Sequence, residues 1–183
     1  LFLGIQFRQG SALSGAAQLL ETLSIVVSVL VFAVGWKAHS INPQRNIFIL
    51  ACGFLGVALL DFSHMLSYAG MPDYITPNLV AKGINFWLPA RYLGALSLLW
   101  ALSLHWHALG ESVSERPQRF AVLALVLAVV AAVHLLVFWY PHWYPETYGS
   151  AGLTAFKIVA EYGVIALYGM SLVLLLHRAR GRT

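Results

Sequence analysis

Charged residues are scarce in this chain of 183 residues, since only 10% are Asp, Glu, Lys or Arg and 60% are hydrophobic. A soluble domain carries about 25% charged residues, so water is not the main solvent of this protein. The bilayer interior offers no hydrogen-bond partners, and a chain within it satisfies its backbone as helices or as a closed barrel. The hydrophobic runs are continuous, about 20 residues long and without alternation, which favours helices.

Cysteine is nearly absent, because Cys52 is the only one and lies within a hydrophobic run. A single cysteine excludes a disulfide framework within the chain and a cysteine-based zinc site. Acidic residues are also few, seven against eleven Lys and Arg. The basic residues lie mostly in short segments between hydrophobic runs, which indicates membrane topology, so no nucleic-acid partner is expected. No nucleotide, nucleophile-elbow or zinc-protease motif occurs, so we expect no enzyme and no catalytic residues in this chain.

Five hydrophobic runs predict an all-α, polytopic transmembrane helix bundle that forms a single domain over residues 1–183. The expected spans cover approximately residues 17–36, 47–68, 84–106, 120–140 and 153–176. The first residues, Leu1 to Ile5, are apolar like the tail of another such segment, which indicates one more span upstream. The lipid bilayer is therefore the first expected partner.

The distribution of basic residues predicts the orientation of the bundle. The segments after the first, third and fifth runs carry seven of them, namely Lys37, Arg45, Arg116, Arg119, Arg178, Arg180 and Arg182. The opposite side offers only Arg8 and Lys82 in its segments. Because cytoplasmic loops carry the excess of Lys and Arg, we expect the C-terminus in the cytoplasm.

An aromatic segment at residues 138–145, Phe-Trp-Tyr-Pro-His-Trp-Tyr-Pro, precedes the fifth run on the expected outer side. Trp and Tyr favour the headgroup region of a membrane, so an interfacial belt is the first interpretation. A lid that stacks on a ligand is the alternative.

Ionisable residues inside the hydrophobic runs are the main functional signal. Each Arg, Lys or Asp costs on the order of 2.5–3.5 kcal/mol near a helix centre on insertion scales. With the expected orientation they lie in the outer half of the bundle, and residues three or four apart share a helix face. We expect a ligand-binding pocket there, lined by Glu21, Asp61, His64, Tyr68, Arg91, His134, Lys157 and Glu161.

A structural interpretation of the same residues is a buried network of ion pairs that fixes helix packing. Arg91 would pair with Glu161, and Lys157 with Asp61 or Glu21. Such a network leaves the intramembrane histidines without a role.

Two interpretations give the histidines a role. His64, Glu21 and His134 together would suit a transition metal ion such as copper, zinc or iron by ligand type. His64 and His134, at comparable depth on neighbouring spans, would alternatively suit the axial positions of haem b in the core of a bundle. The sequence leaves the metal, the haem and a small organic ligand open.

The order of motifs in these runs resembles a known family. The motifs are residues 60–71, Leu-Asp-Phe-Ser-His-Met-Leu-Ser-Tyr-Ala-Gly-Met, residues 85–92, Asn-Phe-Trp-Leu-Pro-Ala-Arg-Tyr, and residues 154–162, Thr-Ala-Phe-Lys-Ile-Val-Ala-Glu-Tyr. With Glu21 ahead of them, they resemble the MASE3 membrane-associated sensor domain over nearly the whole chain.

The resemblance implies an N-terminal sensory module of a bacterial signalling protein in the inner (cytoplasmic) membrane. Such modules precede PAS, histidine kinase, diguanylate cyclase or phosphodiesterase domains, and by analogy with those outputs a homodimer is expected. The positions that match family motifs, and that the resemblance marks as functional, are Glu21, His64, Arg91, Lys157 and Glu161. His134 matches no such motif.

A looser similarity connects the chain with the membrane part of ethylene receptors, in which acid and histidine residues hold copper. Cys52 lies twelve residues before His64, about three helical turns away. A copper site made by that pair on one helix is therefore not supported, whereas a site of histidine and carboxylate remains open.

These observations predict a transmembrane sensory domain that binds a metal, haem or small ligand in the outer half of its bundle. A haem-carrying redox membrane protein, similar to cytochrome b in its use of histidines, is the alternative, and a visible absorption band would identify it. A purely structural anchor is the third hypothesis, which predicts that charge-preserving changes such as Glu21→Asp have little effect.

Overall fold

The computed structural model describes the chain except for residues 1–10, 42–43, 70, 105–115, 151 and 181–183. The long helices are α1 (Ser11–Ile41), α2 (Arg45–Leu66), α3 (Val80–Ser103), α4 (Arg116–Trp139) and α5 (Ala155–Arg180). Each predicted span overlaps one of them, so the all-α prediction is confirmed. The first helix begins at Ser11, earlier than the predicted residue 17. Leu1 to Ile5, Arg8, Arg182 and the end of the third predicted span lie outside the described residues.

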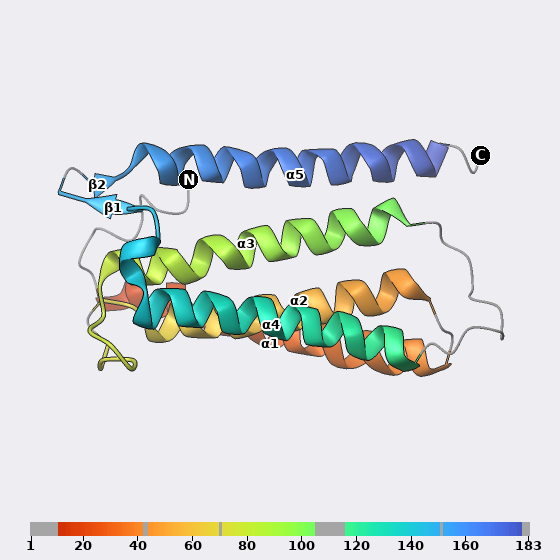
Figure 1. Ribbon diagram of the computed structural model, residues 1–183, viewed down its shortest axis with the longest axis horizontal. Helices are drawn as coiled ribbons and strands as arrows, with labels where there is room; N and C mark the ends of the chain where they lie inside the picture. The colour runs from red at the N-terminus through yellow and green to blue at the C-terminus, as the bar shows by residue number, and fades with distance from the viewer. Residues whose placement is uncertain (1–10, 42–43, 70, 105–115, 151, 181–183) are drawn as a thin grey trace.

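Four of these helices are long and apolar enough to cross a membrane. The segments that qualify are Gln18–His39, Arg45–Leu66, Gln118–Trp139 and Ala155–Arg180. Among the described residues the third expected span does not qualify, and its helix α3 contains Pro89 and the charged Arg91. The prediction of five spans is therefore confirmed for four helices, although α3 runs alongside the others in Figure 1.

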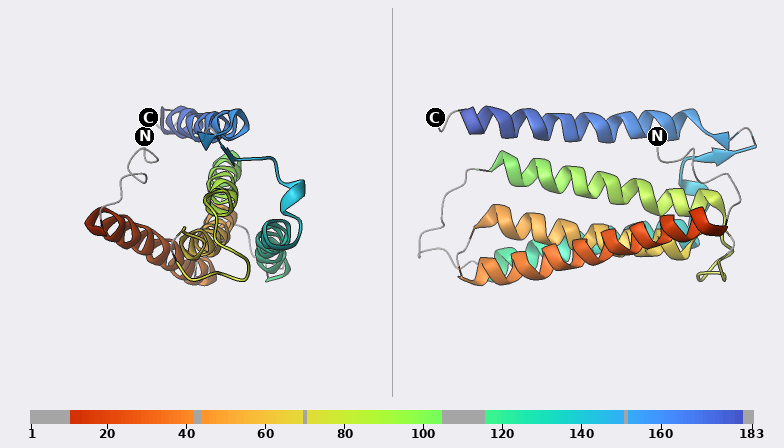
Figure 2. Two further views of the ribbon diagram at one scale, coloured as in Figure 1. Left: turned by 90° about the vertical axis from the view of Figure 1, so that its left-hand side faces the viewer. Right: turned by 180° about the vertical axis from the view of Figure 1, so that it is seen from behind.

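Helix α2 lies at the centre of the bundle and packs against α1, α3 and α4, whereas α5 packs against α3. The end-on view in Figure 2 shows α1 and α4 on different sides of α2, with α5 beyond α3. Of the apolar segment in α2, 61% is buried, compared with 6% in α1 and 11% in α5. The outer helices thus present apolar side chains such as Val159 and Val173 outward, as expected for a surface that contacts lipid.

Small residues allow α2 and α3 to approach each other closely. A Cβ atom added to Gly53 would lie 2.2 Å from Ser97 Oγ, a distance that real contacts do not reach. Helices in membranes commonly pack through such small residues, because apolar side chains gain little by leaving an apolar solvent. A core cluster shared by α2, α3 and α4 is formed by Leu60, Phe86, Ala90, Val130, Val133, Val137 and Phe138.

One end of the bundle contains the start of α1, α3 and α5 and the end of α2 and α4. Here a short helix, η1 (Pro141–Trp143), leads into the strands β1 (Tyr148–Gly149) and β2 (Gly152–Leu153), which pair antiparallel. We call this the hairpin end (Figure 1). The sequence did not predict the hairpin, and buried Thr147 beside it donates a 2.7 Å hydrogen bond to Asn85 Oδ1 of α3.

The aromatic segment at residues 138–145 ends α4 and forms η1. Trp139, Tyr140 and Trp143 are exposed, as an interfacial belt requires. Tyr144 is half-buried, and its burial raises the pKa of its phenol to about 12. Both the belt and the lid remain predictions.

The segment between α2 and α3 is tied to the hairpin end by two side chains. Asn78 Nδ2, with two hydrogens to donate, lies within 3.5 Å of four backbone carbonyl oxygens, including that of Leu66 at 3.0 Å. The ammonium of buried Lys82 donates to the carbonyls of Tyr74 and Thr76 and to Asn78 Oδ1. All three Lys82 protons are used, so this residue holds the connection between α2 and α3 in one conformation.

Candidate functional site

Asp61 and Arg91 join α2 to α3 near the hairpin end. Arg91 Nη2 lies within hydrogen-bonding distance of both carboxylate oxygens of Asp61, and the two side chains are 10% and 30% exposed. The guanidinium also lies 5.7 Å from the ring centroid of Trp87, one turn earlier on α3. Ion pairing and the aromatic ring together hold a charge that would be costly in lipid.

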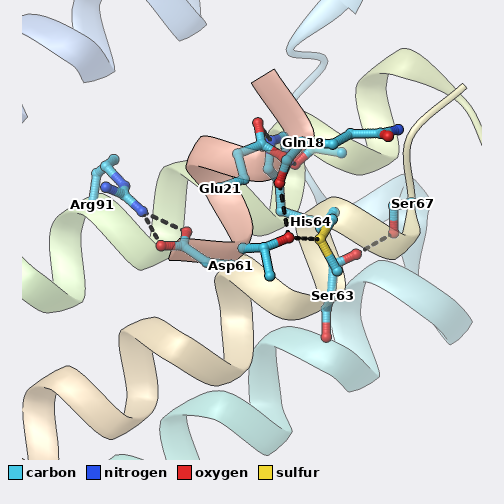
Figure 3. Close-up of polar contacts among 10 residues, drawn as sticks. Gln18, Glu21, Asp61, Ser63, His64, Ser67 and Arg91 are labelled. Carbon is cyan, nitrogen blue, oxygen red and sulfur yellow. Dashed lines mark hydrogen bonds and ion pairs between the residues drawn. The ribbon is translucent and has the colours of Figure 1, made fainter. Parts of the chain in front are cut away.

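Glu21 and His64 join α1 to α2 in the same layer (Figure 3). His64 Nδ1 lies 2.8 Å from the carbonyl oxygen of Gly83 in the first turn of α3. Because a carbonyl only accepts, Nδ1 carries the hydrogen and Nε2 is left for another partner. Nε2 lies 3.7 Å from Glu21 Oε1, in a pair whose histidine and glutamate side chains are 13% and 29% exposed.

Lys157 and Glu161 are paired on α5. Lys157 Nζ lies 2.6 Å from Glu161 Oε1, as the i,i+4 spacing allows, and the lysine side chain is fully buried. Its ammonium lies 5.3 Å from the ring centroid of Trp87, on which Arg91 also packs. Trp87 therefore lies between the charge pair of α2 and α3 and the charge pair of α5.

The predicted pairing of the charges is wrong. Arg91 pairs with Asp61 and not with Glu161, and Lys157 pairs with Glu161 of its own helix and not with Asp61 or Glu21. The reason is packing. The interface of α2 and α3 brings Asp61 to Arg91, whereas α5 packs on α3, away from Asp61 and Glu21, so Lys157 pairs within its own helix.

His134 of α4 does not join the other predicted site residues. Its Nδ1 lies 2.7 Å from the carbonyl oxygen of Val130, and its Nε2 lies 2.8 Å from Ser63 Oγ. Both nitrogens are thus engaged on the side of α2 that faces α4, whereas His64 contacts Glu21 and Gly83. These residues do not fit a haem held by two histidines, and they do not bring His134 to a metal with Glu21 and His64.

No group of three or more His, Cys, Asp or Glu side chains that could hold a metal occurs within the described ranges. Tyr68 also departs from its expected place. Helix α2 ends at Leu66, so the helical face of Asp61 and His64 does not continue to Tyr68, whose carbonyl instead accepts from Asn78 Nδ2.

An open groove of about 400 Å³ lies beside the Glu21–His64 pair. It is lined by Gln18, Leu19 and Thr22 from α1 and by Met65 and Met71 from the end of α2 and the loop after it. Neither this groove nor Trp87 is among the residues predicted from the sequence. Both could have been inferred from spacing in the sequence. Trp87 lies four residues before Arg91, on the same helix face, and Met65, which lines the groove, follows His64 directly.

The bundle has a central apolar helix, outer helices with exposed apolar side chains, and paired charges within the helices. These features define a polytopic helical membrane domain. Residues 16–183 match the family model of the membrane-associated sensor domain MASE3. The chain belongs to this family, as its motifs indicated. No curated protein and no solved structure matches it.

Proposed function

We propose that this domain is the transmembrane input module of a bacterial signalling protein, such as a histidine kinase or a diguanylate cyclase. A small ligand binds at the hairpin end, which faces away from the cytoplasm, and the domain itself catalyses no reaction. The observation that carries the proposal is a set of polar contacts in one layer. Glu21 meets His64 between α1 and α2, Asp61 meets Arg91 between α2 and α3, and Trp87 of α3 lies near both Arg91 and Lys157 of α5.

The chemistry of this layer suits a switch. A ligand that binds His64 or Glu21 changes the contact between α1 and α2, and Asp61 lies one turn before His64 on α2. Any shift of α2 alters the charge pair with Arg91 and, through Trp87, the surroundings of Lys157. Occupancy then favours one of two helix arrangements, and α5 carries that preference to a cytoplasmic output, which works as a homodimer.

The test is the output activity of the full-length protein with His64→Ala. We expect the response to stimulus to be lost, because the variant removes the group that joins α1 to α2 and α3. His142→Ala is the matched control, since this histidine is exposed in η1 outside the polar layer. An unchanged response in His64→Ala would remove the basis of the proposal.

A structural anchor is the second candidate, because Asp61–Arg91 and Lys157–Glu161 already form charge pairs without a ligand. It predicts that Glu21→Asp and His64→Ala leave output unchanged while Arg91→Leu lowers the amount of folded protein. Sensing predicts that Glu21→Asp alters the response at a normal protein level. The response of the full-length protein with Glu21→Asp or His64→Ala therefore distinguishes the two candidates.

A further inference from the structure

His64 has the arrangement of a metal-ligating histidine. Ligating histidines almost always donate their second ring nitrogen to a backbone carbonyl or carboxylate, which fixes the tautomer and the ring orientation. The hydrogen bond from Nδ1 to the Gly83 carbonyl at 2.8 Å does this, and it leaves Nε2 as a free donor of electrons. His134 lacks this property, because both of its nitrogens lie within 2.8 Å of oxygen atoms of Val130 and Ser63.

The distance between His64 and Glu21 suits a shared cation. Nε2 and Oε1 are 3.7 Å apart, which is longer than a direct hydrogen bond of about 2.7–3.2 Å. Two ligand atoms that each lie about 2.0–2.2 Å from one ion are about 3.3–4 Å apart. The pair therefore has the spacing of two ligands with one positive ion between them.

Two methionines line the groove next to this pair. The chain has three methionines, and two of them, Met65 and Met71, line the groove beside the pair. Met65 Sδ lies 3.5 Å from the hydroxyl of Thr22, the residue after Glu21, so the sulfur faces α1 at the level of the carboxylate. A thioether is a soft ligand and attracts soft cations.

We propose that His64, Met65 and Met71, with Glu21 as a charge-balancing ligand, form a binding site for one soft monovalent cation of the Cu(I) class. Structural zinc sites use four Cys, His or carboxylate ligands, and the described part of the chain offers no group of even three such side chains. A site of one imidazole and two thioethers selects Cu(I) over Zn²⁺ and Mg²⁺. The cation would be the ligand of the proposed sensory site. Its biological role rests on the proposed function, whereas its binding to these residues does not.

The test is titration of the purified chain in lipid nanodiscs with Ag(I), a redox-inert cation of the same class, and with Cu(I) against a chromophoric chelator. All variants carry Cys52→Ala, because the buried thiol is a competing soft ligand. We expect one Ag(I) per chain. The affinity for Ag(I) should fall at least tenfold in the double variant Met65→Leu/Met71→Leu and by a similar factor in His64→Ala. Leucine is chosen because it nearly conserves the volume of methionine.

Met170→Leu is the matched control, because this methionine is exposed on α5 outside the groove, and we expect it to bind Ag(I) like the parent. Absence of binding in the parent, or equal affinity in the parent and the double methionine variant, overturns the proposal. Zn²⁺ binding that depends on His64 but not on the methionines also overturns it in favour of a borderline metal. A third result separates the two proposals. If the parent binds Ag(I) as expected but the response of full-length His64→Ala is unchanged, the sensory function is contradicted and the cation site is still supported.

Discussion

Charge pairs between helices distinguish the hairpin end of the bundle from the opposite end, although both ends have side chains that contact backbone carbonyls. At the hairpin end, side-chain charges from neighbouring helices face each other, as in Asp61–Arg91 and Glu21–His64. At the opposite end, Arg178 of α5 donates to the carbonyls of Leu104 and Ser103 at 2.7 and 3.0 Å. Asn46 of α2 donates to the carbonyl of Ala101 at 2.6 Å.

The difference lies in which groups would be left without partners. The last carbonyls of a helix have no partner within the helix, so Arg178 and Asn46 satisfy acceptors that every helix end leaves open, and the positive charge favours the helix C-terminus. The pairs Asp61–Arg91 and Glu21–His64 have no such backbone reason, unlike Lys82, whose ammonium donates to backbone carbonyls. The two pairs are costly in an apolar medium, and this cost is the reason for proposing a function for them.

The largest effect that would test this comparison is the loss of Arg91. We expect Arg91→Leu to lower the free energy of unfolding by about 3 kcal/mol, because it leaves the 10% exposed Asp61 carboxylate without its partner. Unfolding by SDS in mixed micelles measures it. In the double variant Asp61→Leu/Arg91→Leu, most of the stability should return, since replacing both partners of a buried pair with apolar groups is often neutral. A double variant as unstable as the single one would contradict the assignment of the pair.

A smaller effect is expected at the opposite end. Arg178→Ala removes two hydrogen bonds from a charged group to the end of α3, and we expect a loss of about 1 kcal/mol in the same assay, because water can replace the donor at this partly exposed position. The Ag(I) affinity of the hairpin end should not change. A cost above that of Arg91→Leu would remove the distinction between the two ends.

A further effect, confined to alkaline pH, concerns the pH dependence of the hairpin end. Tyr144 lines the groove between α3 and α5, and its burial raises the pKa of the phenol to about 12. Its unfolded value is about 10, so the burial of the neutral phenol stabilises the fold below about pH 10 and this contribution is lost as the pH rises towards 12. Melting temperatures between pH 9 and 12 should therefore fall less in Tyr144→Phe than in the parent, with Tyr140→Phe, an exposed neighbour, as control.

The sequence predicts the helices well because their cause is local. Hydrophobic runs of membrane length form helices wherever they meet the bilayer, and each predicted span overlaps a helix. The depth of the polar layer follows from the same positions, and Glu21, Asp61, His64 and Arg91 do meet at one end. The hairpin escapes prediction because β1 and β2 have only two residues each.

The partners within the layer could not be predicted, because they depend on the rotation of each helix about its axis. Ser63 and His64 are adjacent in sequence, yet one faces His134 and the other faces Glu21. Residues next to each other on a helix point about 100° apart, so one helix can serve two sites. The depth of a histidine therefore says little about its partners, which is why His64 and His134 are not paired.

The position of α5 beyond α3 has a mechanical consequence. With α1 packed on α2, α2 on α3 and α3 on α5, the described helices form interfaces in series from the Glu21–His64 pair to the C-terminal helix. Under the proposed function, the free-energy difference that reaches α5 would be limited by the weakest of these interfaces, whatever the affinity of the site between α1 and α2 for its ligand. Trp87, whose ring lies near both Arg91 and Lys157, occupies the step from α3 to α5 in this series.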